Sequence, residues 1–356
     1  MKTMYKILVG TYTERILFGS GRILDGKGEG IYLLEFDSKR HMMHTRNVYT
    51  EIRNPSYFAV SSDKSFLWTV NECKDYDETG TGYVTALKFA DRMERLVPIN
   101  TVSSFGGDPC HIITDNQEDY VFVSNYMGGS FSVYAVRPEG ALRHIQTVCH
   151  SGHSVLPRQT SPHVHSIRFL PDSNRFYAAD LGTDQLVKYI WEHEIVNPTG
   201  ESLMLPAGSG PRQFCFASNS ERCYVVDELS GCISFANGDL AVVIETWKAN
   251  APGSNMCSEV KLSRNKNFLY LACKETNTIS IYAVDKKSGM LSPKGYVSCE
   301  GKNPRHFDIS PNGEYLFCAN QDSDCITVFS INKVTGGLNH ILSFETPTPV
   351  FIKILS

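Results

Sequence analysis

Hydrophobic and polar residues alternate along most of the chain in short runs separated by polar turns. Six runs end in Asn, Asp or Cys plus one further residue: "SFLWTVNE", "DYVFVSNY", "RFYAADL", "RCYVVDEL", "FLYLACKE" and "YLFCANQ". After a loop, each is followed by a second alternating run: "YVTALKF", "FSVYAV", "LVKYIW", "CISFA", "ISIYAV" and "ITVFSI". Runs of this length and period are typical of half-buried β-strands. We therefore expect an all-β chain with few or no helices.

A further strand begins just ahead of each turn. The chain therefore repeats a unit of strand, turn, strand, loop and strand. The first residues of the units, taken as position zero, are Pro55, Pro109, Val164, Pro211, Cys257 and Pro304. In all six units the residue after the Asn, Asp or Cys then falls at plus seventeen without a gap: Glu72, Tyr126, Leu181, Glu228, Lys274 and Gln321. A period of about 45–54 residues with four strands is typical of a β-propeller blade.

The two ends of the chain predict a seventh blade. "KILVGTYT" and "GIYLLEF" at the front read as strands, and so does "TPVFIKIL" at the back. Pairing strands from both termini in one blade closes the ring and removes its exposed edges. We therefore predict a seven-bladed β-propeller, with its last blade closed by both termini, as a single domain over residues 1–356.

This topology brings side chains from distant blades together. The first strand of each blade lines the central channel, and its start lies at the same end as the finish of the antiparallel second strand. Positions plus one and plus seventeen should therefore meet at one mouth. The plus-one residues are Ser56, Cys110, His165, Arg212, Ser258 and Arg305, and the plus-two residues are Tyr57, His111, Ser166, Gln213, Glu259 and His306.

The residue types at this mouth favour an enzyme site for an anion. Arg212, Arg305 and Lys274 would attract phosphate or carboxylate, which guanidinium grips through two hydrogen bonds. His165 and Glu228 would supply a group that moves a proton near neutral pH. Concave sites with convergent polar groups are the usual place for small ligands.

Composition narrows the classes of partner. The chain has 356 residues, 42% of them hydrophobic and 20% charged, with a formal net charge of −4. The sequence contains neither a basic block for nucleic acid nor an apolar run of membrane-spanning length. The eleven cysteines form no CxxC pair, and most lie in apolar runs, so we expect reduced, buried thiols and a cytoplasmic location.

Several motifs resemble the lactonase family of seven-bladed propellers, whose best-known activity is 6-phosphogluconolactonase. They are "GTYT…GIYLLEFD", "NPSYFAVSSDKSFLWTVNE", "GGDPCHI…VFVSNYMGGSFSVY", "PHVHSIRFLPDSNRFYAADLGTDQL", "GSGPRQF…CYVVDEL" and "NPRHFDISPNGEYLFCANQDSDCITVF". The resemblance covers essentially the whole chain. It implies hydrolysis of an anionic sugar lactone, most simply 6-phosphogluconolactone, without metal or cofactor.

The resemblance also implies roles for individual residues. His165 in "PHVHS", Arg212 in "GPR" and Glu228 in "DEL" match the proposed catalytic positions of the family. Two residues depart from the family pattern: Lys274 stands where relatives have Arg, and Gln213 stands where they commonly have His. Lys274 keeps the charge but loses the planar fork of Arg.

A mechanism follows as a hypothesis. Arg212, Arg305 and Lys274 hold the anionic group and polarise the lactone carbonyl, and His165 activates water, or Glu228 does so if its pKa is raised. The remaining substrate-binding candidates are plus-two residues: His111, His306 and Gln213. For the two histidines, packing between blades is the alternative.

Other functions fit parts of the pattern. A muconate-type lactonizing or isomerising enzyme, which shares the fold, would use the same cations and proton-transfer group. A non-catalytic propeller scaffold would scatter its charges rather than gather them at two slots. His163 and His165 could share a zinc ion, but no third ligand has matching spacing. A calcium-dependent gluconolactonase would need convergent carboxylates. The acidic loop over residues 73–81 reads as either a lid or a disordered tip.

Overall fold

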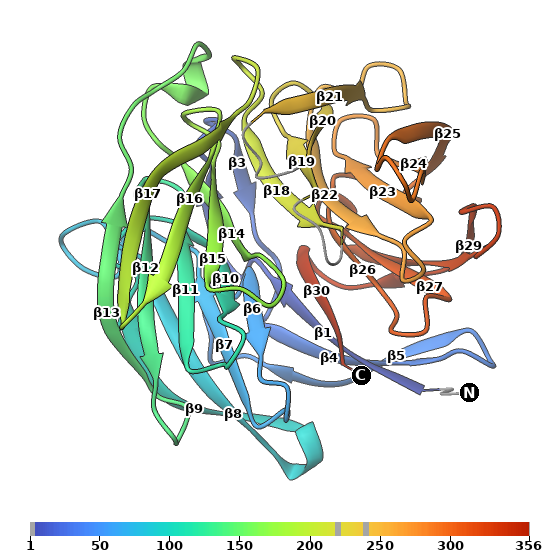
Figure 1. Cartoon of the computed structure of the whole chain (residues 1–356). Coiled ribbons are helices and arrows are strands. Elements are labelled where there is room, and N and C mark those ends of the chain that lie inside the picture. Colours follow the sequence, from blue (N-terminus) through green and yellow to red (C-terminus); the bar gives the residue numbers. More distant parts are fainter. Residues whose placement is uncertain (1–3, 218–221, 238–241, 356) are drawn as a thin grey trace.

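The computed structural model describes residues 4–217, 222–237 and 242–355 of the chain. Within them, seven four-stranded antiparallel sheets stand around a common centre (Figure 1). We number these sheets as blades and give their strands from the innermost outward. Blades 1 to 3 are β6 (Tyr57–Val60), β7 (Phe66–Asn71), β8 (Tyr83–Ala90) and β9 (Arg95–Ser103); β10 (Pro109–Thr114), β11 (Tyr120–Asn125), β12 (Ser130–Val136) and β13 (Leu142–Cys149); and β14 (Val164–Phe169), β15 (Arg175–Asp180), β16 (Gln185–Glu192) and β17 (Ile195–Met204).

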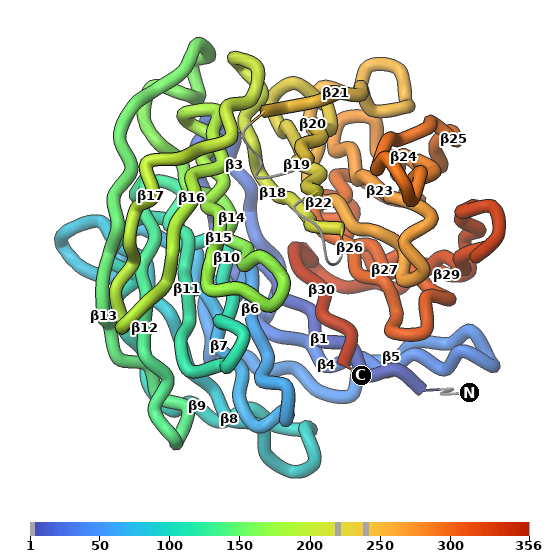
Figure 2. Tube along the Cα trace, viewed as in Figure 1, coloured from blue at the N-terminus to red at the C-terminus, as the bar shows by residue number. Residues whose placement is uncertain are grey.

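Blades 4 to 6 repeat the same order. They are β18 (Pro211–Phe216), β19 (Cys223–Asp227), β20 (Cys232–Ala236) and β21 (Val243–Lys248); β22 (Cys257–Leu262), β23 (Phe268–Cys273), β24 (Thr278–Val284) and β25 (Leu291–Ser298); and β26 (Pro304–Ile309), β27 (Tyr315–Asn320), β28 (Cys325–Ile331) and β29 (Leu338–Glu345). The chain therefore circles the centre once, as its colour sequence shows in the tube view (Figure 2).

Blade 7 closes the ring with strands from both ends of the chain. Its order is β30 (Pro349–Leu355), β1 (Met4–Thr11), β4 (Ile31–Asp37) and β5 (Met42–Tyr49). The last strand pairs antiparallel with the first, from Lys6 opposite Leu355 to Gly10 opposite Phe351. The predicted seven-bladed propeller and its closure by both termini are both confirmed.

The hydrophobic faces of the strands pack between successive blades. Between blades 6 and 7, for example, Tyr5, Phe36 and Ile352 meet Phe317 and Val328, and all five side chains are almost fully buried. Because a strand alternates its side chains between two faces, each inner blade strand can pack against both neighbouring blades. This explains why the quoted runs are apolar almost throughout, as strands buried on both faces are.

The inner strands begin with β-bulges. The pairing of β14 with β15 runs from Val164 opposite Asp180 directly to Ser166 opposite Ala179, so His165 is the extra residue. Shifts at the same place leave Cys110 and Arg305 as extra residues in blades 2 and 6. In blade 4 the shift spans Arg212 and Gln213. A bulge re-aims the side chains of its strand, and these bulges hold the plus-one residues.

A few elements lie outside the blades. A short hairpin of β2 (Arg15–Leu17) and β3 (Ile23–Asp25) interrupts blade 7 between β1 and β4. Three single-turn 3-10 helices complete the described elements: η1 (Asp91–Met93), η2 (Pro157–Gln159) and η3 (Gln321–Ser323). In the described residues, no helix has the length and apolar character needed to cross a membrane.

Candidate active site

A cavity of about 400 Å³ occupies one mouth of the central channel. Its wall comes from the starts of inner strands and the ends of second strands, which are the plus-one and plus-seventeen positions. From these it receives Cys110, His165, Arg212, Arg305, Glu72, Tyr126, Glu228, Lys274 and Gln321. The hairpin of β2 and β3 adds one further side, including Phe18 and Arg22. The predicted convergence at one mouth is therefore seen in the geometry.

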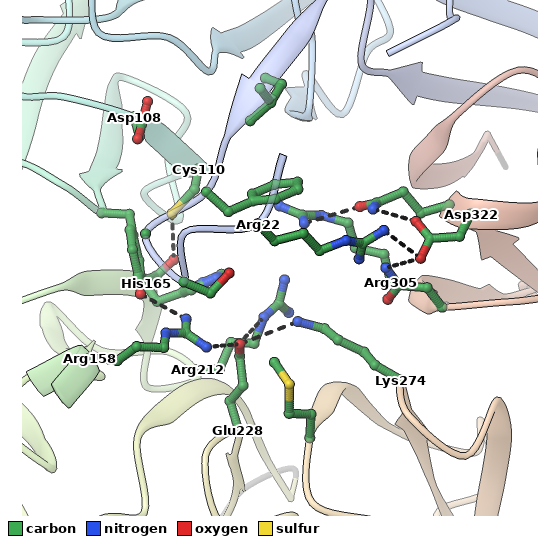
Figure 3. Close-up of a pocket in the computed structure, with 18 of the residues that line it drawn as sticks. Arg22, Asp108, Cys110, Arg158, His165, Arg212, Glu228, Lys274, Arg305 and Asp322 are labelled. Atoms are coloured by element: carbon green, nitrogen blue, oxygen red, sulfur yellow. Dashed lines mark hydrogen bonds and ion pairs between the residues drawn. The ribbon is translucent and has the colours of Figure 1, made fainter. Parts of the chain in front are cut away.

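Glu228 lies at the centre of a cluster of cations (Figure 3). Its Oε2 is 2.8 Å from Arg212 Nε, and its Oε1 is 3.1 Å from Arg158 Nη1 and 3.3 Å from Lys274 Nζ. The Glu228 side chain is only 4% exposed. One buried carboxylate therefore faces three cationic side chains from three different parts of the ring.

This cluster sets the protonation of its own members. Burial alone would raise the pKa of Glu228, but the charges of Lys274, Arg158 and Arg212 hold it well below its usual range. Burial, followed by the repulsion of Arg212 and Arg305, lowers the pKa of Lys274 to about 7 even though Glu228 counteracts the shift. Glu228 therefore stays ionised, and Lys274 titrates near neutral pH. The condition for Glu228 to act as the general base, a raised pKa, is therefore not met.

His165 is a buried, neutral imidazole in the same cavity. Burial, with the nearby charge of Arg212, lowers its pKa well below the usual value. Its Nδ1 is buried and has no hydrogen-bond partner, and its ring meets Tyr126 edge-on at 5.8 Å between centroids. An imidazole that is neutral at pH 7 and has no partner at Nδ1 can accept a proton there.

His163 points elsewhere. Its ring stacks against Tyr126, with centroids 4.5 Å apart, and its Nδ1 is 2.9 Å from the Tyr126 carbonyl oxygen; His163 does not line the cavity. Because β14 begins only at Val164, His163 lies outside the strand, and the alternation of side chains along β14 does not determine which way His163 points. Among the residues that the structure describes, no three His, Cys, Asp or Glu side chains are grouped to hold a metal ion.

A second set of charges lines the other side of the cavity. Arg305 donates to the Tyr12 hydroxyl at 2.6 Å and to Gln321 Oε1 at 3.2 Å, and lies 3.7 Å from Glu72. Its guanidinium also stands over the Tyr12 ring at 5.1 Å. Arg22, from the hairpin, reaches across to Asp322 on η3 at 2.7 Å. These cations, unlike those around Glu228, each have a carboxylate of their own.

The buried Asp184 holds the loops that carry two of the cations. Its Oδ1 accepts from the Gly210 amide at 2.6 Å and from Gln159 Nε2 at 2.7 Å, and its Oδ2 accepts from the Gly208 amide at 2.7 Å. Gln159 neighbours Arg158 on η2, and Gly210 lies two residues before Arg212. Asp184 in the "GTDQL" motif is therefore a positioning residue for both arginines.

Three candidate binding residues lie outside this cavity. His111 and His306 line a second cavity toward the other end of the inner strands. Gln213 accepts from Arg168 Nη2 at 3.2 Å, on the same side. The reason is that the bulge turns plus-one residues to one mouth, while the next residue along the strand lies deeper in the channel. The geometry therefore removes His111, His306 and Gln213 from the set that can touch one substrate with His165.

Among the lining residues that sequence reasoning missed, three bear on the chemistry of the site. Arg158 lies in the connection between β13 and β14, residues 150–163, which is longer than the connection at residues 104–108 and could have signalled a mouth insertion. Arg22 lies in the hairpin inserted into blade 7. Asp108 directly precedes β10, and burial, followed by the charge of Glu72, raises its pKa to about 6. It is therefore a second candidate for proton transfer.

The loop over residues 73–81 is held by local contacts. Asp77 accepts hydrogen bonds from Thr79 and Thr81, and Asp75 pairs with Arg53 at 2.7 Å. Lys74 donates to the Leu17 carbonyl of the hairpin at 3.3 Å. The loop therefore supports the hairpin at the edge of the site.

Comparison with known proteins matches the whole propeller. The family described as "Lactonase, 7-bladed beta-propeller" covers residues 6–354. The chain is 28% identical to 6-phosphogluconolactonase of Bacillus subtilis, with 99% of each chain covered. A crystal structure of the periplasmic gluconolactonase of Pseudomonas aeruginosa is 29% identical, with a TM-score of 0.90 over 99% of both chains. A structure of a proposed 6-phosphogluconolactonase from Bacteroides fragilis is also 29% identical, with a TM-score of 0.89 over 100% of this chain and 99% of that one.

Proposed function

The chain belongs to the lactonase family of seven-bladed β-propellers, and from that premise we propose that it hydrolyses 6-phosphogluconolactone to 6-phosphogluconate. It is a lactonase, a carboxylic ester hydrolase that acts on a sugar lactone. The relatives compared above include both a 6-phosphogluconolactonase and a gluconolactonase. The proposal therefore concerns the phosphate and the mechanism.

The surplus of positive charge around Glu228 carries the proposal. Arg158, Arg212 and Lys274 share that single carboxylate at 2.8–3.3 Å, so their combined charge exceeds its charge. Removing cations from water without full compensation is costly, and a bound anion offsets that cost. The oxyanion that develops on the lactone carbonyl supplies this compensation, and the carboxylate of the product does so after the ring opens.

The reaction needs one general base and positively charged groups that stabilise the oxyanion. Nδ1 of neutral His165 takes a proton from water, and the water oxygen attacks the lactone carbonyl carbon to form a tetrahedral oxyanion. Arg212 and Lys274 stabilise that oxyanion, as fixed positive groups in a buried site do. The bond from the carbonyl carbon to the ring oxygen then breaks. The ring oxygen takes the proton from His165, which leaves a hydroxyl group and a carboxylic acid, and the acid then releases its proton to solvent to become the carboxylate.

The other residues position the substrate and the cations that stabilise the oxyanion. Glu228, with its low pKa, remains a carboxylate and holds the three cations in place rather than taking a proton. Arg305 and Arg22 stand on the opposite wall, where they can bind the phosphate. The Tyr12 and Phe18 rings lie within 5.4 Å of the Arg305 guanidinium and orient it.

We further propose that the reaction uses no metal and that the enzyme works in the cytoplasm. The cations beside Glu228 would repel a divalent metal ion, and they supply the positive charge that such an ion would otherwise provide. All eleven cysteines of the chain, each within the described residues, are free thiols. Free thiols are typical of a reducing compartment.

The direct test is a stopped assay of 6-phosphogluconolactone hydrolysis with EDTA present, corrected for the spontaneous rate. His165→Gln should lower kcat by about 10²–10⁴-fold, the usual worth of a general base. His340→Gln removes an exposed imidazole on β29 and should leave the rate unchanged. A wild-type rate no higher than the spontaneous rate would refute the substrate, and a rate abolished by EDTA would refute metal independence.

Asp108→Asn separates the two candidate bases. The Asp108 carboxyl lines the same cavity and has a pKa near neutrality. If His165 is the base, Asp108→Asn retains most of kcat. If Asp108→Asn loses more of kcat than His165→Gln does, the assignment of the base is wrong.

A further inference from the structure

The other end of the inner strands encloses a second cavity, of about 610 Å³. Its wall includes residues further along the inner strands β6, β10, β14, β22, β26 and β30. The starts of the inner strands lie at the first mouth. Residues in it include Tyr57, His111, Arg168, Lys261, His306 and Lys353. None of its lining residues lines the first cavity. It is therefore a separate compartment of the same channel.

Positive charge dominates this cavity. Five cationic residues line it, Arg168, Lys261, Arg264, Lys266 and Lys353, and Asp308 is the single carboxylate among its described lining residues. Asp308 Oδ1 accepts from Lys261 Nζ at 3.0 Å and from the Ile309 amide at 2.9 Å, and its Oδ2 accepts from the Ile354 amide at 3.1 Å. Its oxygens are therefore already occupied.

Glu259 offers little further compensation. It is fully buried behind the wall, 3.3 Å from His306 Nε2, and burial raises its pKa. Even when Glu259 is ionised, five cationic side chains stand against two carboxylates. Burial and the charge of Lys261 lower the pKa of His306, and burial and the charge of Arg168 lower that of His111, so both rings stay neutral.

One donor of a lining residue, Arg168, lacks a hydrogen-bond partner. The Nε of Arg168 is buried without a hydrogen-bond partner, although its Nη2 donates to Gln213. His111 Nδ1 faces the Ile167 amide at 3.5 Å, and His306 Nδ1 accepts from the Ile352 amide at 3.2 Å. The proton of the neutral His306 ring is therefore on Nε2. A buried guanidinium nitrogen without an acceptor is costly unless a ligand satisfies it.

We propose that this second cavity is a binding site for a small oxyanion, with the Arg168 guanidinium, Lys261 and Lys353 as its ligands. The shared chemistry is that of a phosphate ester or a dicarboxylate, since both match a planar guanidinium flanked by ammonium groups. The volume suits a metabolite rather than a macromolecule. The site is independent of lactone hydrolysis at the opposite mouth.

The test is isothermal titration of the full chain with inorganic phosphate, and in a second arm with malonate. Arg212→Gln weakens anion binding at the first cavity, and the part of the remaining binding that depends on Lys353 reports the second cavity. In the Arg212→Gln background, Lys353→Gln should raise the Kd by about tenfold, as expected for loss of one charge-assisted contact worth about 1.4 kcal/mol. Lys353→Arg should restore binding. The arm that binds more tightly identifies phosphate or dicarboxylate as the ligand class.

Lys286→Gln is the matched control. Lys286 is exposed in the turn between β24 and β25, outside both cavities. Added to Arg212→Gln, Lys286→Gln should leave the Kd for the anion unchanged. Lys353→Gln in the otherwise wild-type enzyme should keep full lactonase activity. Equal Kd values for the Lys353 and Lys286 variants would overturn the proposal. So would the absence of any binding of either anion to Arg212→Gln at millimolar concentration. Neither result depends on which lactone the enzyme hydrolyses.

Discussion

We expect Lys274 to make kcat/KM fall as the pH rises above 7. Its pKa in the folded protein is about 7, against 10.5 for a lysine free in water. At pH 8 only about a tenth of the molecules then carry the charge, so kcat/KM should fall about tenfold for each pH unit above 7. Lys274→Arg keeps its charge throughout this range and should show no such fall.

The same group should affect stability with the opposite sign. Between pH 7 and 10.5 the unfolded chain carries a proton on Lys274 that the folded chain has released. The free energy of unfolding therefore rises with pH across this window, by about 1.4 kcal/mol per pH unit from this group. Lys274→Met, which has no proton to release, should lack this contribution.

Two experiments measure these effects. Initial rates from pH 6 to pH 9, corrected for the spontaneous hydrolysis of the lactone, give kcat/KM for wild type and Lys274→Arg. Denaturant unfolding at the same pH values gives the free energy of unfolding for wild type and Lys274→Met. Parallel pH profiles of kcat/KM for wild type and Lys274→Arg would refute the reasoning, because they would show that the Lys274 charge does not limit the reaction.

Three further substitutions test other parts of the site. Glu228→Gln leaves three cations without their shared carboxylate and should cost roughly 3–5 kcal/mol of unfolding free energy; Glu245→Gln, on the exposed face of β21, should cost almost nothing in the same denaturation experiment. Asp184→Asn removes an acceptor from the loops that carry Arg158 and Arg212, so kcat/KM should fall while the pH profile keeps its shape. A displaced profile would show that Asp184 titrates in the reaction. Arg305→Gln should raise KM for the phosphorylated lactone by about 10–100-fold, the worth of a charged hydrogen bond. An equal rise for glucono-δ-lactone would show that Arg305 does not bind the phosphate.

The repeat determined how much of this site the sequence could predict. Positions plus one and plus seventeen are defined without gaps, and antiparallel pairing places them at one end of each hairpin. For that reason His165 of blade 3 could be grouped with Arg212 and Glu228 of blade 4, although the two blades are separate sheets. Closure of the ring by β1 and β30 could likewise be predicted, because the strand count left one blade incomplete.

Three features lay beyond that reasoning. Strict alternation does not reveal a bulge, so the separate fate of plus-two residues such as His306 could not be deduced from spacing. Arg158 comes from a connection between blades, where no repeat fixes the geometry. The lowered pKa of Glu228 depends on how close three cations lie to its carboxylate, and only the folded structure gives those distances.

The most direct measurement is a crystal structure of the enzyme with 6-phosphogluconate bound. Hydrolysis at the first mouth predicts that the product carboxylate contacts Arg212 and Lys274 within hydrogen-bond distance of His165, with the phosphate toward Arg305. Product that occupies the cavity with its carboxylate remote from His165, or that binds at the opposite end of the channel alone, would contradict the proposed chemistry.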